Sequence, residues 1–153
     1  MSFRLPRAAR SKFFKDLEFD VAFDIYYLCL MVGLAGGRKQ DLPNADGVDV
    51  VDYFPGDYGK RANLIVALFL ARELKSLGIE MSDRKAVQGA VAKLISTTTA
   101  TRLSDEGLRV MNKYAFGGYS ELIERFQERP RALEIFLPSY WRLMAELGAR
   151  DND

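Results

Sequence analysis

The chain has 153 residues, of which 48% are apolar and 28% are charged, so it is long enough for one domain with an ordinary hydrophobic core. Its 22 basic and 21 acidic residues leave a formal net charge of +1, which excludes a global attraction for nucleic acid or membranes. With no histidine and one cysteine, Ser-His-Asp and Cys-His catalysis, imidazole zinc sites and an internal disulfide are also excluded.

Residues 1–15 form a basic segment that we expect to be an N-terminal arm on a single domain covering residues 1–153. The segment contains no acid and five cations: Arg4, Arg7, Arg10, Lys12 and Lys15. Such a segment can contact phosphates, so one hypothesis is nucleic-acid binding. Four further cations are candidates for the same surface: Arg38, Lys39, Lys60 and Arg61. The competing explanation is a contact between the arm and the acidic segment 41–57, within one chain or between subunits.

Apolar residues at three- and four-residue steps predict a helix over residues 13–35. Its most apolar part, residues 21–36, is shorter than the roughly 20 residues that a membrane span needs, and it contains Asp24. We therefore expect a central helix buried on most sides, no membrane association and a cytoplasmic protein in which Cys29 is a buried free thiol. Gly36 and Gly37 predict the end of this helix.

Residues 40–59 are rich in proline, glycine and aspartate and predict a long acidic loop, with a short extended piece at residues 48–51. The loop does not fit a calcium-binding EF-hand, because a glycine at the sixth position, Gly47, places Leu42 and Tyr53 at the first and last ligand positions. A loose Mg²⁺ site at Asp46, Asp49 and Asp52 is the alternative to a solvated loop. We favour the solvated loop and expect no cofactor.

The rest of the chain predicts a series of further helices. Residues 60–77 form a helix whose inward stripe is Leu64, Ile65, Leu68, Leu74 and Leu77. Ser82 and Asp83 cap a helix through residue 95, and Ser104 caps another that ends at Gly117 and Gly118. Shorter helices follow over residues 119–128, 130–136 and 140–147, with Pro138 as a break and a frayed tail at 149–153. The predicted fold is an all-α, compact bundle of six or seven helices.

The hydroxyl-rich run between two of these helices suggests a phosphate site. Thr101, Arg102 and Ser104 precede a helix N-terminus, where backbone N–H groups attract anions. The simpler interpretation is that they end one helix and cap the next. Residues 82–115 also resemble a helix-turn-helix with Arg109, Asn112 and Lys113 facing outward, although the linker is longer than usual.

Aromatic residues next to predicted turns are the candidates for a protein interface, because aromatic side chains are enriched there. They are Tyr53, Phe54, Phe116, Tyr119, Tyr140 and Trp141. The lack of any complete catalytic motif favours a non-enzymatic subunit or adaptor that binds another protein or itself. The alternatives are nucleic-acid binding through the basic arm, and a carboxylate- or metal-dependent enzyme using Asp46, Asp49 and Asp52 or Glu121 and Glu124.

Overall fold

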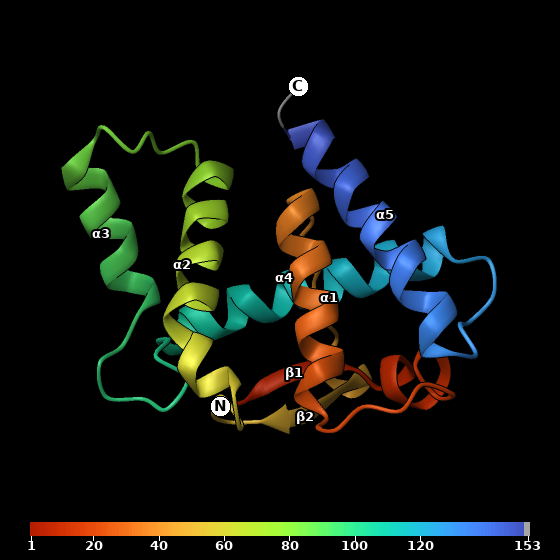
Figure 1. Ribbon diagram of the computed structural model, residues 1–153. Helices are drawn as coiled ribbons and strands as arrows, with labels where there is room; N and C mark the ends of the chain where they lie inside the picture. Colours follow the sequence, from red (N-terminus) through yellow and green to blue (C-terminus); the bar gives the residue numbers. More distant parts are fainter. Residues whose placement is uncertain (152–153) are drawn as a thin grey trace.

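The computed structural model describes residues 1–151, which are mostly helical with one small sheet (Figure 1). In chain order the elements are β1 (Phe3–Pro6), the π-helix η1 (Ala9–Phe13), α1 (Phe23–Gly36), the 3₁₀ turn η2 (Asn44–Asp46), β2 (Gly47–Val51), α2 (Tyr58–Ser76), α3 (Arg84–Leu94), α4 (Asp105–Arg125) and α5 (Leu133–Asp151). The predicted helical character is confirmed. Within residues 1–151, no helix has both the length and the apolar character that crossing a membrane requires.

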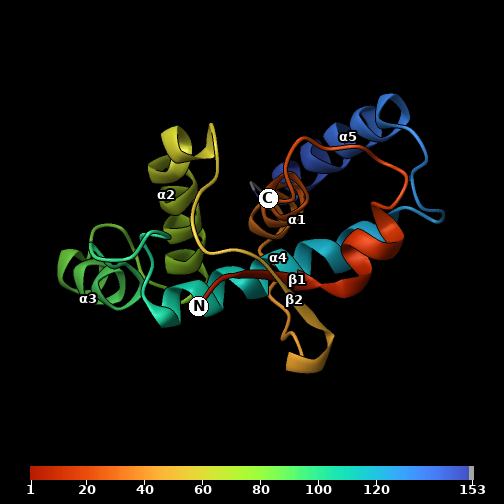
Figure 2. The same ribbon diagram turned by 90° about the horizontal axis from the view of Figure 1, so that it is seen from below.

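Helices α1 and α4 cross at the centre of the molecule, with α2 and α5 on either side of α1 and α3 outside α2 (Figures 1 and 2). The crossing is very close, because a methyl group added at Gly118 would lie 1.7 Å from the carbonyl oxygen of Cys29. One added at Gly33 would lie 1.9 Å from the carbonyl oxygen of Tyr114. The prediction that Gly117 and Gly118 end a helix is therefore wrong. These glycines lie inside α4 at a helix contact, and the helix expected at 119–128 is its continuation.

The central helix is shorter than predicted, since α1 begins at Phe23 and not at residue 13. Its expected end is confirmed: Gly37 adopts φ +64°, a left-handed conformation that glycine adopts without strain, and Arg38 N donates to Gly33 O at 3.0 Å. Cys29 is fully buried in α1, as expected, and burial raises the pKa of its thiol.

The basic N-terminal segment folds onto the domain as an integral part of it. β1 pairs antiparallel with β2, with Phe3 opposite Val51 and Pro6 opposite Gly47. The Phe3 ring is fully buried at 5.0 Å from the ring centre of Tyr26, and η1 buries Ala9 and Phe13. Alternate apolar residues therefore anchor this segment, which is why it is a strand and a short helix and not a free arm.

A contact between the basic and the acidic segment occurs within one chain, through Arg4, one of the five cations. Arg4 Nε lies 3.0 Å from the Asp49 carboxylate, and Ser2 Oγ donates to the same carboxylate at 2.7 Å. The predicted extended piece of the acidic loop is β2, so strand pairing and an ion pair hold the basic and acidic segments together.

The inward face of α2 differs from the predicted stripe. The residues that it buries are Ala62, Ile65, Val66, Phe69, Glu73 and Leu74. Leu64 is 60% exposed, Leu68 44% and Leu77 54%, so the prediction is wrong for these three. The helix carries apolar residues on two sides, and spacing alone does not show which of the two sides meets α4.

Helix caps agree with the sequence, whereas the expected break at Pro138 does not occur. The Asp83 carboxylate accepts from Ala86 N at 3.2 Å, and Ser104 Oγ accepts from Gly107 N at 3.0 Å. Helix α5 continues through Pro138, because its buried stripe continues on both sides and outweighs one missing backbone hydrogen bond. That stripe consists of Phe136, Tyr140, Leu143 and Leu147.

The expected frayed tail is only partly described. Residues 149–151 form the last turn of α5, where the Asp151 carboxylate lies 2.8 Å from both Arg72 Nη1 and Lys75 Nζ. Residues 152–153 lie outside the described residues.

Candidate functional site

Several of the cations proposed for nucleic-acid binding are paired with carboxylates of the same chain. Arg38 donates to Glu124 through both Nη atoms at 2.8 Å, and to Glu121 at 2.9 Å. The hydrogen bonds with Glu124 are the main cause of a raised pKa at Arg38 and a lowered pKa at Glu124. Lys39 Nζ lies 2.9 Å from the buried carboxylate of Glu73. Glu121 and Glu124, the candidate acid–base carboxylates, are therefore ion-pair partners.

The other proposed cations are more accessible. Arg7, Arg10, Lys12 and Lys15 are exposed on η1 and its flanks, and no carboxylate within residues 1–151 forms an ion pair with them. Lys60 is exposed at 3.8 Å from the Asp57 carboxylate, and Arg61 is exposed at the N-terminal end of α2. A local group of four free cations thus remains on the N-terminal segment.

The proposed phosphate residues are engaged in local hydrogen bonds. Thr101 is buried, and its Oγ1 accepts from Leu103 N at 3.3 Å. Arg102 adopts φ +62° and donates to the side chain of Asn63. Ser104 Oγ donates to Lys93 O at 2.5 Å besides capping α4. This arrangement matches the simpler interpretation, in which the segment ends α3 and caps α4.

The three aspartates of the acidic loop do not converge. Asp49 is paired with Arg4, and within residues 1–151 no group of three or more carboxylate, cysteine or histidine side chains is placed to hold a metal ion.

The helix-turn-helix interpretation meets a correction at Asn112, which was expected to face outward. Asn112 is buried; its Oδ1 accepts from Tyr26 Oη at 2.8 Å and from Arg4 N at 3.0 Å, and its Nδ2 donates to Ser2 O at 3.1 Å. The side chain therefore joins β1, α1 and α4 inside the domain. A base-contacting surface on α4 that includes Asn112 is thus excluded.

The six aromatic interface candidates fall into two groups. Tyr53 and Trp141 are exposed, and Phe116 is half-buried. Phe54, Tyr119 and Tyr140 are buried in the core, and Tyr140 Oη donates to Leu28 O at 2.7 Å. Trp141, at 65% exposure, is the largest side chain that the described residues leave open to solvent.

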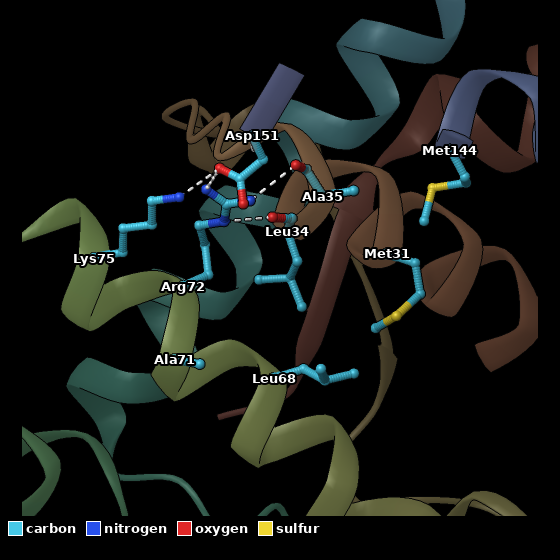
Figure 3. A pocket seen from close by; sticks show the side chains of 9 residues that line it. All are labelled: Met31, Leu34, Ala35, Leu68, Ala71, Arg72, Lys75, Met144 and Asp151. Atoms are coloured by element: carbon cyan, nitrogen blue, oxygen red, sulfur yellow. Dashed lines mark hydrogen bonds and ion pairs between the residues drawn. The ribbon is translucent and has the colours of Figure 1, made fainter. Parts of the chain in front are cut away.

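An apolar groove lies between α1 and α2 and reaches α5 (Figure 3). It has a volume of about 390 Å³ and is open to solvent. Leu68 and Met31 point toward one another across it from α2 and α1 (Figure 3). The remaining apolar wall consists of Leu34, Ala35, Ala71 and Met144. Side chains of this kind, methionine above all, adapt to an apolar partner surface.

Polar contacts close the groove at the C-terminal ends of α1 and α2. Arg72 Nε donates to Leu34 O at 2.6 Å and Arg72 Nη2 to Ala35 O at 2.9 Å, as the dashed lines in Figure 3 mark. Asp151 of α5 pairs with Arg72 and with Lys75 at the same place. These contacts join three helices, and Arg72 adds hydrogen bonds to carbonyl groups in the last turn of α1.

A second hollow of about 370 Å³ lies at the N-terminal ends of the same two helices. Tyr58 Oη donates to the Asp24 carboxylate at 2.5 Å, which joins α2 to α1 there, and burial together with this bond raises the pKa of Tyr58. Asp20, Asp57 and Arg61 also line this hollow. Because α1 and α2 are joined at both ends, the apolar space between them is a defined groove and not a gap left by loose packing.

The sequence did contain a signal for this groove. Leu64, Leu68, Ala71 and Lys75 recur at three- and four-residue steps beside the buried stripe of α2, so the helix has a second apolar side. Residues 27, 31 and 35 form a half-exposed line on α1, although this helix is apolar on all sides. The sequence predicts that α1 is covered on most sides, and it does not distinguish these residues as a site.

Comparison with known protein families, with curated proteins and with solved structures found no match to this chain.

Proposed function

We propose that this chain is a non-enzymatic helical subunit of a cytoplasmic complex and that it binds another protein chain in the groove between α1 and α2. The observation that carries the proposal is the apolar wall that α1, α2 and α5 leave open to solvent, with Leu68, 44% exposed, as part of it. Apolar grooves between helices are a common docking place for an amphipathic helix.

Further side chains beside the groove support the proposal. Leu64 lies one turn before Leu68 on α2, and Trp141 lies three residues before Met144 on α5, so both are on the groove side of their helices. Exposed leucine and tryptophan side chains of this kind are typical of interaction surfaces and are unfavourable in water.

The test is selection of binding peptides from a library of displayed amphipathic helices, followed by affinity measurements. We expect selected peptides to lose at least about tenfold in affinity for Leu68→Asp, since a buried charge in an apolar contact costs more than about 1.4 kcal/mol. The matched control is Met81→Asp, because Met81 is 68% exposed in the turn between α2 and α3, away from the groove. Equal loss in both variants, or no selected peptide that depends on Leu68, would contradict the proposal.

A second candidate function is nucleic-acid binding by the four free cations of the N-terminal segment. Arg7, Arg10, Lys12 and Lys15 are exposed, which supports the idea of a phosphate-contacting surface. The measurement is fluorescence anisotropy of a generic DNA duplex at about 50 and about 200 mM salt, with the wild type and a variant carrying glutamine at all four positions. Salt-sensitive binding that the variant loses would favour this function, and equal binding by both proteins would remove it.

A further inference from the structure

We infer that the occupant of the groove is a second copy of this chain, docked antiparallel about a two-fold axis that crosses α1 and α2 at mid-length, so that the groove of each copy meets the N-terminal ends of α1 and α2 of the other. This inference rests on the proposed function and names its partner. It follows from three properties of the groove: its direction, the charge at its two ends and the side chains at its centre.

The groove has two chemically different ends because α1 and α2 run in the same direction (Figure 1). Their N-terminal ends meet at the Asp24–Tyr58 hydrogen bond, and their C-terminal ends meet at the Arg72–Leu34 hydrogen bond. Between these contacts, α1 extends over ten residues, or about 15 Å. A two-fold axis across the middle brings the N-terminal end of one groove against the C-terminal end of the other.

The two ends carry opposite net charge. Three carboxylates line the hollow at the N-terminal ends of the two helices, from Asp20, Asp24 and Asp57, against one lining cation, Arg61, while the nearby Lys60 lies 3.8 Å from Asp57. At the C-terminal end the lining charges are two cations, Arg72 and Lys75, and one carboxylate, Asp151. An antiparallel pair therefore places acidic ends against basic ends twice, whereas a parallel pair places like ends together.

Between the two ends, one side of α2 beside the groove is apolar and exposed, and two residues of this side, Leu68 and Ala71, line the groove. Residues 64, 67, 68 and 71 of α2 are leucines and alanines at three- and four-residue steps, and all four are exposed. Residues close to a two-fold axis contact their own copies, so this stripe would meet itself between the two charged ends. A surface that is apolar at its centre and oppositely charged at its ends is complementary to itself in this one orientation.

The first test is the mass of the intact chain in solution, by sedimentation equilibrium at about 100 µM, where a dimer with a Kd of about 10 µM is mostly formed. We expect twice the 17.3 kDa of one chain for the wild type and for Met81→Asp, and one chain mass for Leu68→Asp. Circular dichroism of Leu68→Asp should be unchanged, because Leu68 is exposed in the single chain. A monomeric wild type, or a dimer that Leu68→Asp leaves intact, overturns the inference.

The second test fixes the orientation by cysteine cross-linking. Cys29 is fully buried, so an introduced cysteine is the reactive one. We expect Leu64→Cys to cross-link with Leu68→Cys, and Arg61→Cys with Ala71→Cys, in each mixture more than either variant does alone. Leu77→Cys, exposed directly after the last residue of α2 and outside the groove, is the control. Self-cross-linking of Arg61→Cys at the expense of the mixture would show a parallel pair and overturn the inference.

The outcome also separates this inference from the proposed function. If the wild type is a monomer but selected helical peptides still depend on Leu68, the groove binds a different protein and only the second-copy inference fails. If neither peptides nor a second copy depend on Leu68, the proposed function fails with it.

Discussion

Arg72 of α2 donates a hydrogen bond of 2.6 Å from Nε to the carbonyl oxygen of Leu34 in the last turn of α1. The same guanidinium donates to Ala35 O at 2.9 Å and pairs with Asp151 of α5 at 2.8 Å. One side chain thus joins the C-terminal ends of three helices and forms the end of the groove. Stability and the proposed docking surface are therefore linked at this residue.

Replacing Arg72 by methionine should lower the free energy of unfolding by about 2 kcal/mol, because charge-assisted hydrogen bonds to two partly buried carbonyl groups are lost. Urea denaturation measures the change. The matched control is Lys75→Met, which removes one exposed ion pair with Asp151 and should cost less than about 1 kcal/mol. Equal effects of the two changes would show that the carbonyl contacts of Arg72 contribute little.

Asp151 makes part of the stability depend on pH. Its hydrogen bonds with Arg72 and then Lys75 lower the pKa of this carboxyl from 3.8 to about 2. Because the folded pKa is below the ordinary one, the contribution of Asp151 is present above about pH 4 and is lost as pH falls toward 2. The difference in unfolding free energy between the wild type and Asp151→Asn should therefore shrink from about pH 5 to about pH 2. A difference that stays constant with pH would contradict the assignment.

The α1–α4 crossing should not tolerate a side chain. Gly118→Ala should lower the free energy of unfolding by at least about 3 kcal/mol, because its methyl group would lie 1.7 Å from a backbone oxygen that cannot move aside without separating the helices. Gly148→Ala in α5 is the control: no atom lies within 4 Å of its added methyl group, so it should be neutral or stabilise by up to about 1 kcal/mol. Thermal denaturation of the wild type and both variants measures these changes in stability, and equal effects of the two substitutions would contradict the prediction.

Asn112 should be essential for folding stability and not for contacts with a ligand. Asn112→Ala leaves the buried Tyr26 hydroxyl and the Arg4 backbone N–H without their acceptor, which should cost about 2–4 kcal/mol. Arg109→Ala, one turn earlier on the exposed side of α4, should change the unfolding free energy by less than about 0.5 kcal/mol. A small effect at Asn112 would mean that water replaces its hydrogen bonds.

Much of the secondary structure could be predicted from short stretches of sequence. Asp83 and Ser104 cap helices because their side chains reach a backbone N–H three residues later, and Gly37 ends α1 because glycine adopts positive φ easily. Each of these interactions lies within one helical turn. The paired charges of the N-terminal and acidic segments were expected as one alternative, since opposite charges attract whatever the fold.

Contacts between residues far apart in the sequence decided how the helices pack and which side chains face the core. The sequence alone determined a mostly helical chain with defined caps, a buried thiol and no imidazole chemistry, because composition and local spacing control these properties. Only the tertiary structure decided that Gly118 lies inside a helix, that Asn112 faces inward and that Leu68 faces a groove. A glycine, an asparagine or a leucine has the same local preferences in either setting, and which neighbour covers it depends on how α1, α2, α4 and α5 pack together.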